Sequence, residues 1–489
     1  MFSNHLLQRK AKIIATIGPA SRSDQTLREL IQAGMNVARL NFSHGTQKEH
    51  GEVIDLIRRI STELSTPVMI LVDLQGPKLR VGKLPSEGIF LLAGSNVIFL
   101  DYHLDVPFST QISELSAIPL SIPGLFSSVK VGDRILLDDG KIEIHVTKTA
   151  DDHAIGQVIV GGQLTSSKGI NIPDTSLSTS AYTEKDRSDL SFGLSKYVDA
   201  FAFSFIRTSD EITTVRNELK AKSKSLGYTP YIIAKIEKPE AVANIDSIID
   251  ASDGIMVARG DLAIETSINK VPVYQKLIVD KANKRNKFVI IATQMLESMT
   301  SMPIPTRAEA SDVANAVLDN ADALMLSGET AIGIYPVETV QRMSSIILET
   351  EQNARWLTPK NSSSTYPNEV DSLSLARAAS ELARDSNVSR IFIFTVSGKT
   401  AQQLSQTRTD IPLVAFTPNS HTLNKLSVLW GIETHQVEFS SSLDSMIATV
   451  DRYMNVTRLQ QPGDQVIIVC GYPFGEARPP NFLYLHTFS

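Results

Sequence analysis

Two charged side chains lie two positions apart in a segment that is otherwise apolar. Lys235 and Glu237 belong to residues 231–237, YIIAKIE. In a β-strand, residues two apart point to the same face, so the ammonium and the carboxylate share a face. A lysine in such a segment is costly unless it is paired or takes part in chemistry. The pattern allows either a structural ion pair or a cation that neutralises an anionic substrate.

A second carboxylate follows the next apolar segment. Asp261 comes after residues 254–260 (GIMVARG), where a helix should begin, and a carboxylate at that place can serve only as a helix cap. Together with Glu237 it also offers two oxygen ligands, which suit Mg²⁺ that keeps waters and substrate oxygens around it. Backbone N–H groups near Arg259 and Gly260 can bind a substrate carboxylate. These groups predict an anionic substrate beside a divalent ion.

Basic residues can supply the remaining charge. Arg39, Lys235 and Arg80 are expected around the site. Phosphoryl transfer depends mainly on alignment and charge neutralisation, which a lysine and Mg²⁺ can provide. The chain has no GxxxxGK[ST] segment, which argues against a P-loop nucleotidase.

Eight short apolar segments, each followed by helical periodicity, must position these residues. Most are apolar throughout, as in parallel strands that are covered on both faces. Polar residues stand at their C-terminal ends, where a TIM barrel builds its active site. We therefore predict a (β/α)₈ barrel with strands in residues 12–18, 37–43, 68–75, 199–206, 231–237, 254–260, 288–296 and 323–329.

The spacing of these segments also predicts further domains. The gap between the third and fourth segments is too long for a loop, and it is β-rich with a hairpin signal at Asp138-Asp139-Gly140. A polar stretch at 359–368 resembles a linker before a last α/β region. We predict barrel residues 1–76 and 181–356, an inserted all-β cap at 77–180 and a C-terminal α/β domain at 357–489.

Composition narrows the partners and the compartment. A net charge of −6 gives no reason to expect nucleic acid or a membrane surface as a partner. Cys470 is the only cysteine, which excludes an intramolecular disulfide. The N-terminal residues lack the apolar core of a signal peptide, and no apolar run reaches the roughly 18–20 residues of a membrane span. These features predict a cytoplasmic protein.

Eight segments follow one another in order across nearly the whole chain. They are TIGPAS (16–21), RLNFSHG (39–45), KGINIP (168–173), AKIEKPEA (234–241), MVARGDLAIE (256–265), ATQMLESM (292–299), PTRAEASDVANAV (305–317) and SGETAIGIYP (327–336). Together they resemble the motif series of pyruvate kinases. The segments AKIE, ARGDL and ATQMLESM are specific to that series, whereas NFSHG alone is weaker.

The resemblance implies a glycolytic enzyme that moves the phosphoryl group of phosphoenolpyruvate to ADP, giving pyruvate and ATP. It implies that Lys235 neutralises the transferred group, that Arg39 contacts phosphate, and that Glu237 and Asp261 hold Mg²⁺ or, in its place, Mn²⁺. The remaining implied roles are substrate-carboxylate binding by Ala258, Arg259, Gly260 and Thr293, proton delivery near Thr293 and Ser327, and nucleotide binding by Asn41, His44, Arg80 and Lys168.

One loop departs from the K⁺-dependent members of that family. Those members resemble one another in having Thr and Glu where this chain has Leu74 and Lys78, and Lys where it has Gln75. The Lys78 ammonium can replace the charge of the ion, so we expect activity without K⁺; the alternative is a solvated Lys78 and a K⁺ requirement. Oxygen atoms for part of a cation pocket remain on Asn41, Ser43 and Asp73.

The segment TVSGKT (395–400) runs from a strand into a glycine turn and a helix, which suits phosphate binding. It resembles the effector loop of the family, which implies an activator, a sugar phosphate or AMP; the alternative is an ordinary turn. Residues 471–481 lack a Gly and a Thr usual in members that respond to fructose bisphosphate, which argues against that activator. The implied effector residues are Thr395, Ser397, Gly398, Lys399 and Thr400.

Two other classes of protein share part of the pattern. A Mg²⁺-dependent aldolase or lyase has paired carboxylates, but no reason for the inserted cap or for Lys235. A catalytically inactive sensor would keep the effector domain, yet Lys235, Glu237 and Asp261 are all present. Ala263 replaces the glycine usual after ARGDL, and its methyl group can crowd the substrate carboxylate. The counterpart of Arg307 in the family lies near a subunit contact, which suggests a homotetramer.

Overall fold

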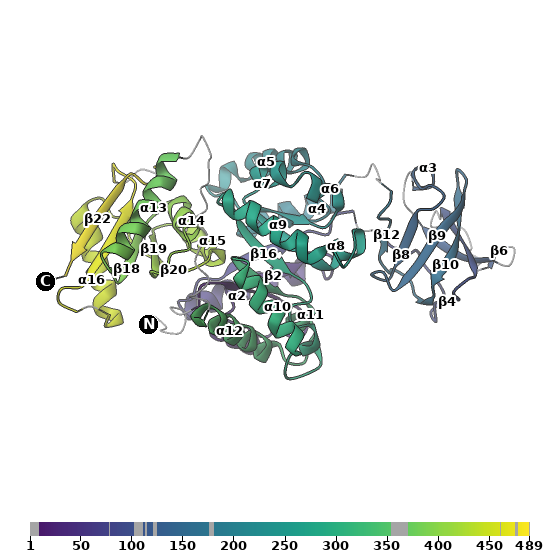
Figure 1. Cartoon of the computed structure of the whole chain (residues 1–489), viewed down its shortest axis with the longest axis horizontal. Helices are drawn as coiled ribbons and strands as arrows, with labels where there is room; N and C mark the ends of the chain where they lie inside the picture. Colours follow the sequence, from purple (N-terminus) through teal and green to yellow (C-terminus); the bar gives the residue numbers. More distant parts are fainter. Residues whose placement is uncertain are drawn as a thin grey trace.

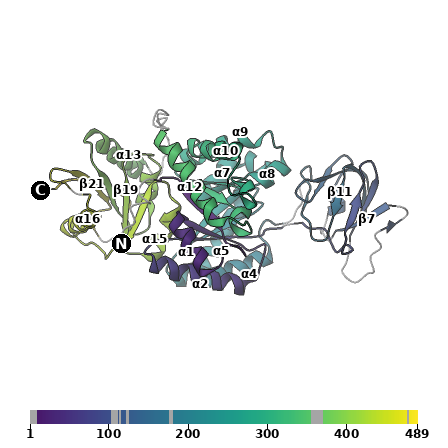
Figure 2. The same ribbon diagram turned by 90° about the horizontal axis from the view of Figure 1, so that it is seen from below.

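The computed structural model describes residues 9–77, 79–101, 111–112, 115–120, 125–175, 180–353, 370–459, 461–474 and 478–488. Lys78 and the predicted linker at 359–368 lie outside these residues. Figures 1 and 2 show three bodies in a row, with the barrel between the sheet-rich cap and the C-terminal domain. Among the described residues, no helix is both long and apolar enough to cross a membrane.

Eight parallel strands close into a barrel in the order β1-β17-β16-β15-β14-β13-β3-β2. Each strand falls in one of the eight predicted apolar segments, and the predicted fold class is confirmed. Their bounds are β1 (Lys12–Thr16), β2 (Val37–Asn41), β3 (Met69–Asp73), β13 (Ala200–Phe203), β14 (Tyr231–Ile236), β15 (Gly254–Ala258), β16 (Phe288–Ala292) and β17 (Ala323–Leu326).

Helices surround the barrel, and capping residues fix where two of them begin. Thr183 and Thr306 each accept a hydrogen bond from the backbone N–H three residues on, and the carboxylates of Asp186 and Glu309 accept one from the backbone N–H of Thr183 and Thr306. The helical segments are α1 (Asp24–Ala33), α2 (Gln47–Glu63), α4 (Glu184–Ser195), α5 (Ser209–Ser223), η1 (Lys224–Leu226), α6 (Pro239–Ala243), α7 (Ile245–Ala251), α8 (Arg259–Glu265), α9 (Val271–Lys284), η2 (Glu297–Thr300), α10 (Arg307–Leu318), α11 (Gly328–Ala331) and α12 (Pro336–Asn353).

The cap is inserted between β3 and β13 and has its own hydrophobic core. It contains a seven-stranded sheet, β12-β8-β9-β10-β5-β7-β6, and a small sheet, β11-β4. Asp138, Asp139 and Gly140 have positive φ angles and form the turn from β8 to β9. The cap elements are β4 (Ile89–Leu91), β5 (Asn96–Asp101), β6 (Gln111–Ile112), β7 (Leu115–Leu120), α3 (Leu125–Ser128), β8 (Arg134–Leu137), β9 (Ile142–Thr149), β10 (His153–Val160), β11 (Gly162–Leu164) and β12 (Ile170–Asn171).

The C-terminal domain contains a five-stranded sheet, β20-β19-β18-β21-β22, in which only the edge strand β22 is antiparallel. One buried apolar cluster runs from the barrel interior into this domain, and Arg408 pairs with Asp322 at 3.1 Å. Because Asp322 precedes β17, the domain covers the N-terminal ends of the barrel strands. Its elements are α13 (Val370–Asp385), β18 (Arg390–Phe394), α14 (Lys399–Ser405), β19 (Leu413–Thr417), α15 (Ser420–Lys425), η4 (Leu426–Val428), β20 (Ile432–Gln436), α16 (Leu443–Thr457), β21 (Gln465–Cys470) and β22 (Phe482–Thr487).

Candidate active site

A buried carboxylate joins two cations at the C-terminal ends of the barrel strands. Asp73 is the last residue of β3 and is 1% exposed. Its Oδ2 atom lies 2.8 Å from both Nε and Nη2 of Arg39, and its Oδ1 atom lies 3.2 Å from Nζ of Lys235. Arg39 also donates to Thr16 Oγ1 at 2.8 Å. Side chains from β1, β2, β3 and β14 therefore form one charged cluster.

Lys235 is the centre of this cluster. Its Nζ atom lies 2.8 Å from Glu237 Oε1 and donates to Ser204 Oγ at 2.8 Å. Burial lowers the pKa of Lys235, but the carboxylates of Asp73 and Glu237 outweigh burial and raise it above its usual range. Lys235 therefore remains an ammonium ion at physiological pH.

Glu237 and Asp261 are the carboxylates that could hold a metal ion. The Oε2 atom of Glu237 accepts the Phe205 backbone N–H at 2.6 Å, and Asp261 stands in the first turn of α8. Burial and the charge of Asp261 raise the pKa of Glu237, while the Lys235 ammonium opposes the rise. A divalent cation beside Glu237 and Asp261 would favour the ionised form of Glu237. The described residues contain no group of three or more His, Cys, Asp or Glu side chains that could hold a metal ion, so an ion bound here would need further oxygen ligands, such as those of substrate and water.

The segment after β16 holds a strained backbone next to α8. Thr293 and Gln294 have φ angles of +71° and +54°, which cost free energy and persist only where the surroundings fix them. Thr293 Oγ1 accepts the Gly260 N–H at 2.8 Å. The Arg259 guanidinium is instead bound to Asp312 at 2.7 Å and to the Thr293 carbonyl at 2.7 Å. Only the backbone of Arg259 is therefore available for the expected substrate contact.

Ser327 brings a buried hydroxyl group to the end of β17. Its backbone N–H donates to Glu329 Oε2 at 2.6 Å, whereas its Oγ atom has no hydrogen-bond partner among the described residues. An orphaned buried hydroxyl costs about 1–3 kcal/mol, so such a group is retained for a reason other than stability. The Ser327 hydroxyl therefore has hydrogen-bonding capacity that the described residues leave unused.

The residues expected at the nucleotide come from two domains. Asn41 and His44 lie at and just after the end of β2, and Asn41 Oδ1 accepts the Ser43 N–H at 3.1 Å. Arg80 lies just after the chain leaves the barrel for the cap, and Lys168 lies just before β12, the last cap strand. Arg80 donates to the Ser167 carbonyl at 2.9 Å, and Lys168 pairs with Asp138 at 2.7 Å. The predicted substitute for K⁺, Lys78, lies outside the described residues.

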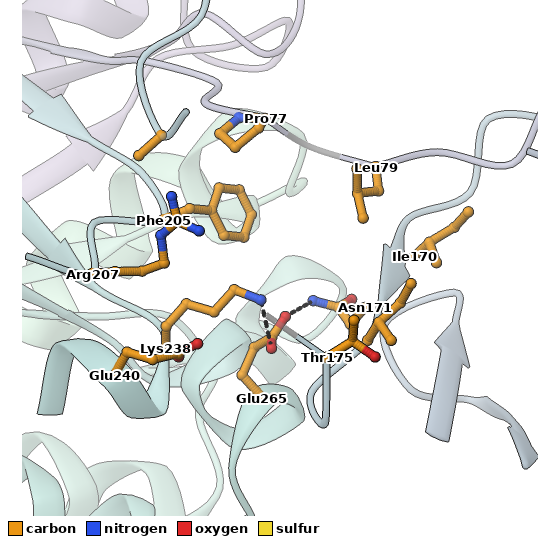
Figure 3. A pocket seen from close by; sticks show the side chains of 12 residues that line it. Pro77, Leu79, Ile170, Asn171, Thr175, Phe205, Arg207, Lys238, Glu240 and Glu265 are labelled. Carbon is orange, nitrogen blue, oxygen red and sulfur yellow. Dashed lines mark hydrogen bonds and ion pairs between the residues drawn. The ribbon is translucent and has the colours of Figure 1, made fainter. Parts of the chain in front are cut away.

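A pocket lies between the cap and the barrel (Figure 3). The cap contributes Asn171, and the barrel contributes Phe205, Lys238 and Glu265. Glu265 accepts hydrogen bonds from both Asn171 and Lys238. This pocket adjoins the charged cluster through Phe205, which lines the pocket and whose backbone N–H donates to Glu237 Oε2.

Sequence reasoning missed several members of the cluster. Thr16 and Ser204 were not singled out, and Asp73 was considered only for a cation pocket rather than as the partner of Arg39 and Lys235. All three are polar residues at or just after the C-terminal end of a barrel strand. That position was the signal that could have identified them.

Comparisons with known proteins agree on one family. Residues 8–340 match the family model described as "Pyruvate kinase, barrel domain", and residues 374–486 match "Pyruvate kinase, alpha/beta domain". The pyruvate kinase of Geobacillus stearothermophilus is 41% identical over 99% of this chain and 81% of its own length. That of Agrobacterium vitis is 40% identical over 97% of this chain and 98% of its own length.

A solved structure agrees with these relatives. The crystal structure of a pyruvate kinase from Cryptosporidium parvum superposes with a TM-score of 0.89 at 32% identity, covering 100% of this chain and 98% of that chain. The likeness therefore includes the barrel, the cap and the C-terminal domain together. The chain belongs to the pyruvate kinase family.

Proposed function

We propose that the charged cluster at the barrel mouth performs the family reaction, transfer of the phosphoryl group of phosphoenolpyruvate to ADP. The observation that carries this proposal is the buried Lys235 ammonium, held between Asp73 and Glu237. Phosphoryl transfer is accelerated mainly by alignment and by neutralisation of charge. Lys235 neutralises the group as it moves, and Arg39 contacts the phosphate. Pyruvate and ATP are the products.

The same cluster suits a divalent cation. Glu237 and Asp261 hold Mg²⁺, which Mn²⁺ can replace; when bound, the ion supplies positive charge beside the substrate oxygens. The backbone from Ala258 to Gly260 and the Thr293 hydroxyl bind the substrate carboxylate. Proton delivery to the enolate carbon runs through the region of Thr293 and Ser327, which is supported by the unpartnered Ser327 hydroxyl.

The nucleotide binds between the barrel and the cap. Asn41 and His44 of the barrel and Arg80 and Lys168 of the cap contact its phosphates. We place the cap at 77–180, the barrel at 1–76 and 181–356 and the C-terminal domain at 357–489. Closure of the cap brings the two pairs of residues to one nucleotide and excludes water, which protects the phosphoryl group from hydrolysis.

A K⁺ ion is not required in this proposal. Both oxygens of Asp73 are engaged by Arg39 and Lys235, and Asn41 Oδ1 is engaged by the Ser43 N–H. These contacts occupy part of the oxygen capacity that Asn41 and Asp73 could offer a monovalent cation. The ammonium of Lys78 supplies the charge instead.

A phosphorylated activator, a sugar phosphate or AMP, binds the C-terminal domain. Thr395, Ser397 and Thr400 line one pocket together with Arg478. Gly398 has a φ of +88°, and its N–H donates to Thr395 Oγ1 at 3.0 Å, which shapes the turn before α14. Lys399, exposed at the start of α14, adds positive charge.

A homotetramer is supported by exposed apolar side chains near Arg307, the first residue of α10. They lie on two neighbouring loops, since the Ile334 N–H donates to the Thr300 carbonyl at 3.1 Å. Such a patch is typical of an interface. Light scattering that gives the mass of a single chain would contradict the assembly. The patch contains Met302, Ile304, Ile332 and Ile334, which are 53–67% exposed.

Replacement of Lys235 tests the catalytic proposal. Lys235→Met keeps the length of the side chain but removes the charge that neutralises the phosphoryl group, so kcat should fall about 10²–10³-fold. Pyruvate production coupled to NADH oxidation by lactate dehydrogenase measures the rate. The control Lys276→Met removes an exposed ion pair with Asp319 and should keep wild-type activity. A Lys235→Met rate within a few fold of wild type would refute the assignment.

Monovalent cations test the role of Lys78. With tetramethylammonium as the sole monovalent cation, wild-type turnover should equal that in K⁺, because the lysine charge is always present. Lys78→Ala should lose activity that K⁺ partly restores. The same assay with each salt at matched ionic strength measures both effects. A large rise in wild-type activity on adding K⁺ would show that Lys78 does not replace the ion.

Removal of three hydroxyl groups tests the effector site. The combined variant Thr395→Ala, Ser397→Ala and Thr400→Ala should abolish activation by a hexose monophosphate and by AMP, because the phosphate loses its donors. The ratio of activity with and without activator, at a subsaturating concentration of phosphoenolpyruvate, measures activation. An unchanged ratio in the variant would place the activator elsewhere.

A further inference from the structure

One buried carboxylate joins the cap to the barrel. Glu265 is the last residue of α8, and its side chain is 1% exposed. Its Oε1 atom accepts a hydrogen bond from Asn171 Nδ2 at 2.7 Å, and its Oε2 atom accepts one from Lys238 Nζ at 2.8 Å (Figure 3). Asn171 belongs to the cap strand β12, whereas Lys238 follows the barrel strand β14. We call Asn171, Lys238 and Glu265 the cap clamp.

The clamp depends on both of its donors. A buried carboxylate is stable only when it is paired and hydrogen-bonded. Each oxygen of Glu265 has one side-chain donor among the described residues, one from each domain. Loss of either donor therefore frees the end of α8 to shift, or frees the cap to move relative to it.

The clamp lies next to both proposed metal ligands. Lys238 directly follows Glu237, and Glu265 stands about one helical turn after Asp261 on α8. The Lys238 Nζ atom also lies 5.9 Å from the ring centroid of Phe205, whose backbone N–H donates to Glu237 Oε2. The clamp is thus connected to Glu237 in two ways: Lys238 is the next residue in the chain, and Lys238 lies near Phe205, which hydrogen-bonds to Glu237.

The cap also comes close to the same helix at a second place. Gly140 lies at the tip of the turn between β8 and β9, and a Cβ atom there would be 3.9 Å from Cγ1 of Ile264. Figure 1 shows β8 and β12 on the side of the cap that faces α8. The cap therefore touches the barrel at the helix that carries Asp261.

We propose that Asn171, Lys238 and Glu265 are positioning residues that couple the placement of the cap to the orientation of the metal-binding carboxylates. The inference rests on the proposed roles of Glu237 and Asp261 as Mg²⁺ ligands. An intact clamp holds both carboxylates in place and ties their geometry to the cap. Groups hydrogen-bonded directly to metal ligands change metal affinity about 10–100-fold when they are removed, and we expect the lower end of that range for the clamp, which acts through chain neighbours of the ligands.

Direct metal binding to the full chain tests the clamp without relying on turnover. Mn²⁺ titration followed by electron paramagnetic resonance should show about 10-fold weaker binding in Asn171→Ala and in Lys238→Met. Lys238→Arg keeps the charge and should recover most of the affinity. Both donors act through Glu265, so the double variant should lose much less than the roughly 100-fold expected for independent sites.

A control within the cap separates positioning from general stability. Asp174→Asn breaks the ion pair with Arg134, 2.9 Å long, and should leave Mn²⁺ affinity unchanged. Asn171→Ser, which keeps a polar group at that position, replaces Asn171→Ala if the latter fails to fold. Wild-type affinity in the clamp variants, or fully multiplicative losses in the double variant, would overturn the proposal.

One further variant distinguishes failure of the clamp from failure of the proposed function. Asp261→Asn should weaken Mn²⁺ binding strongly if Asp261 is a ligand. Binding that depends on Asp261 but not on Asn171 or Lys238 overturns the clamp alone. Binding that is unaffected by Asp261→Asn overturns the metal assignment and the clamp with it.

Discussion

The rest of the site depends on the pairing of Asp73 with Arg39 and Lys235. A buried carboxylate that loses its partner destabilises a protein by about 3–5 kcal/mol. The folded protein therefore needs all three charges to be paired with one another. This pairing orients the Arg39 guanidinium and the Lys235 ammonium in the absence of substrate. Glu237 and Ser204 complete the environment of Lys235, so its ammonium can move little. The Lys235 ammonium and the Arg39 guanidinium are therefore held in place in advance, and charges preorganised in this way lower a reaction barrier most.

The architecture keeps one end of the barrel free for this cluster. The C-terminal domain continues the hydrophobic core at the N-terminal ends of the strands, where Arg408 pairs with the buried Asp322. The chain leaves the barrel after β3, close to Asp73, and forms the cap, of which β12 is the last strand. The site therefore lies between the barrel and the cap. Helix α8 carries both the proposed metal ligand Asp261 and a contact with the cap.

The sequence predicted the fold better than the details of the site. Each barrel strand was recognisable because a strand covered on both faces is apolar throughout, and the hairpin at Asp138 because of its turn residues. The contact of Arg39 with Asp73 joins residues 34 positions apart, and no local pattern encodes it. The contacts of the Arg259 guanidinium could not be predicted from local sequence either, because its partners lie on α10 and after β16. The clamp was missed since Asn171 and Glu265 meet only when two domains pack.

A crystal structure of the chain grown with Mn²⁺, oxalate and ATP, with the metal located by anomalous scattering, tests the proposed site most directly. We predict one manganese peak bonded to carboxylate oxygens of both Glu237 and Asp261, with the oxalate carboxylate at the backbone of Gly260. The γ-phosphate should then lie within hydrogen-bond distance of Lys235. A manganese peak that does not contact Glu237 and Asp261, or a phosphate remote from Lys235, would contradict the proposed site.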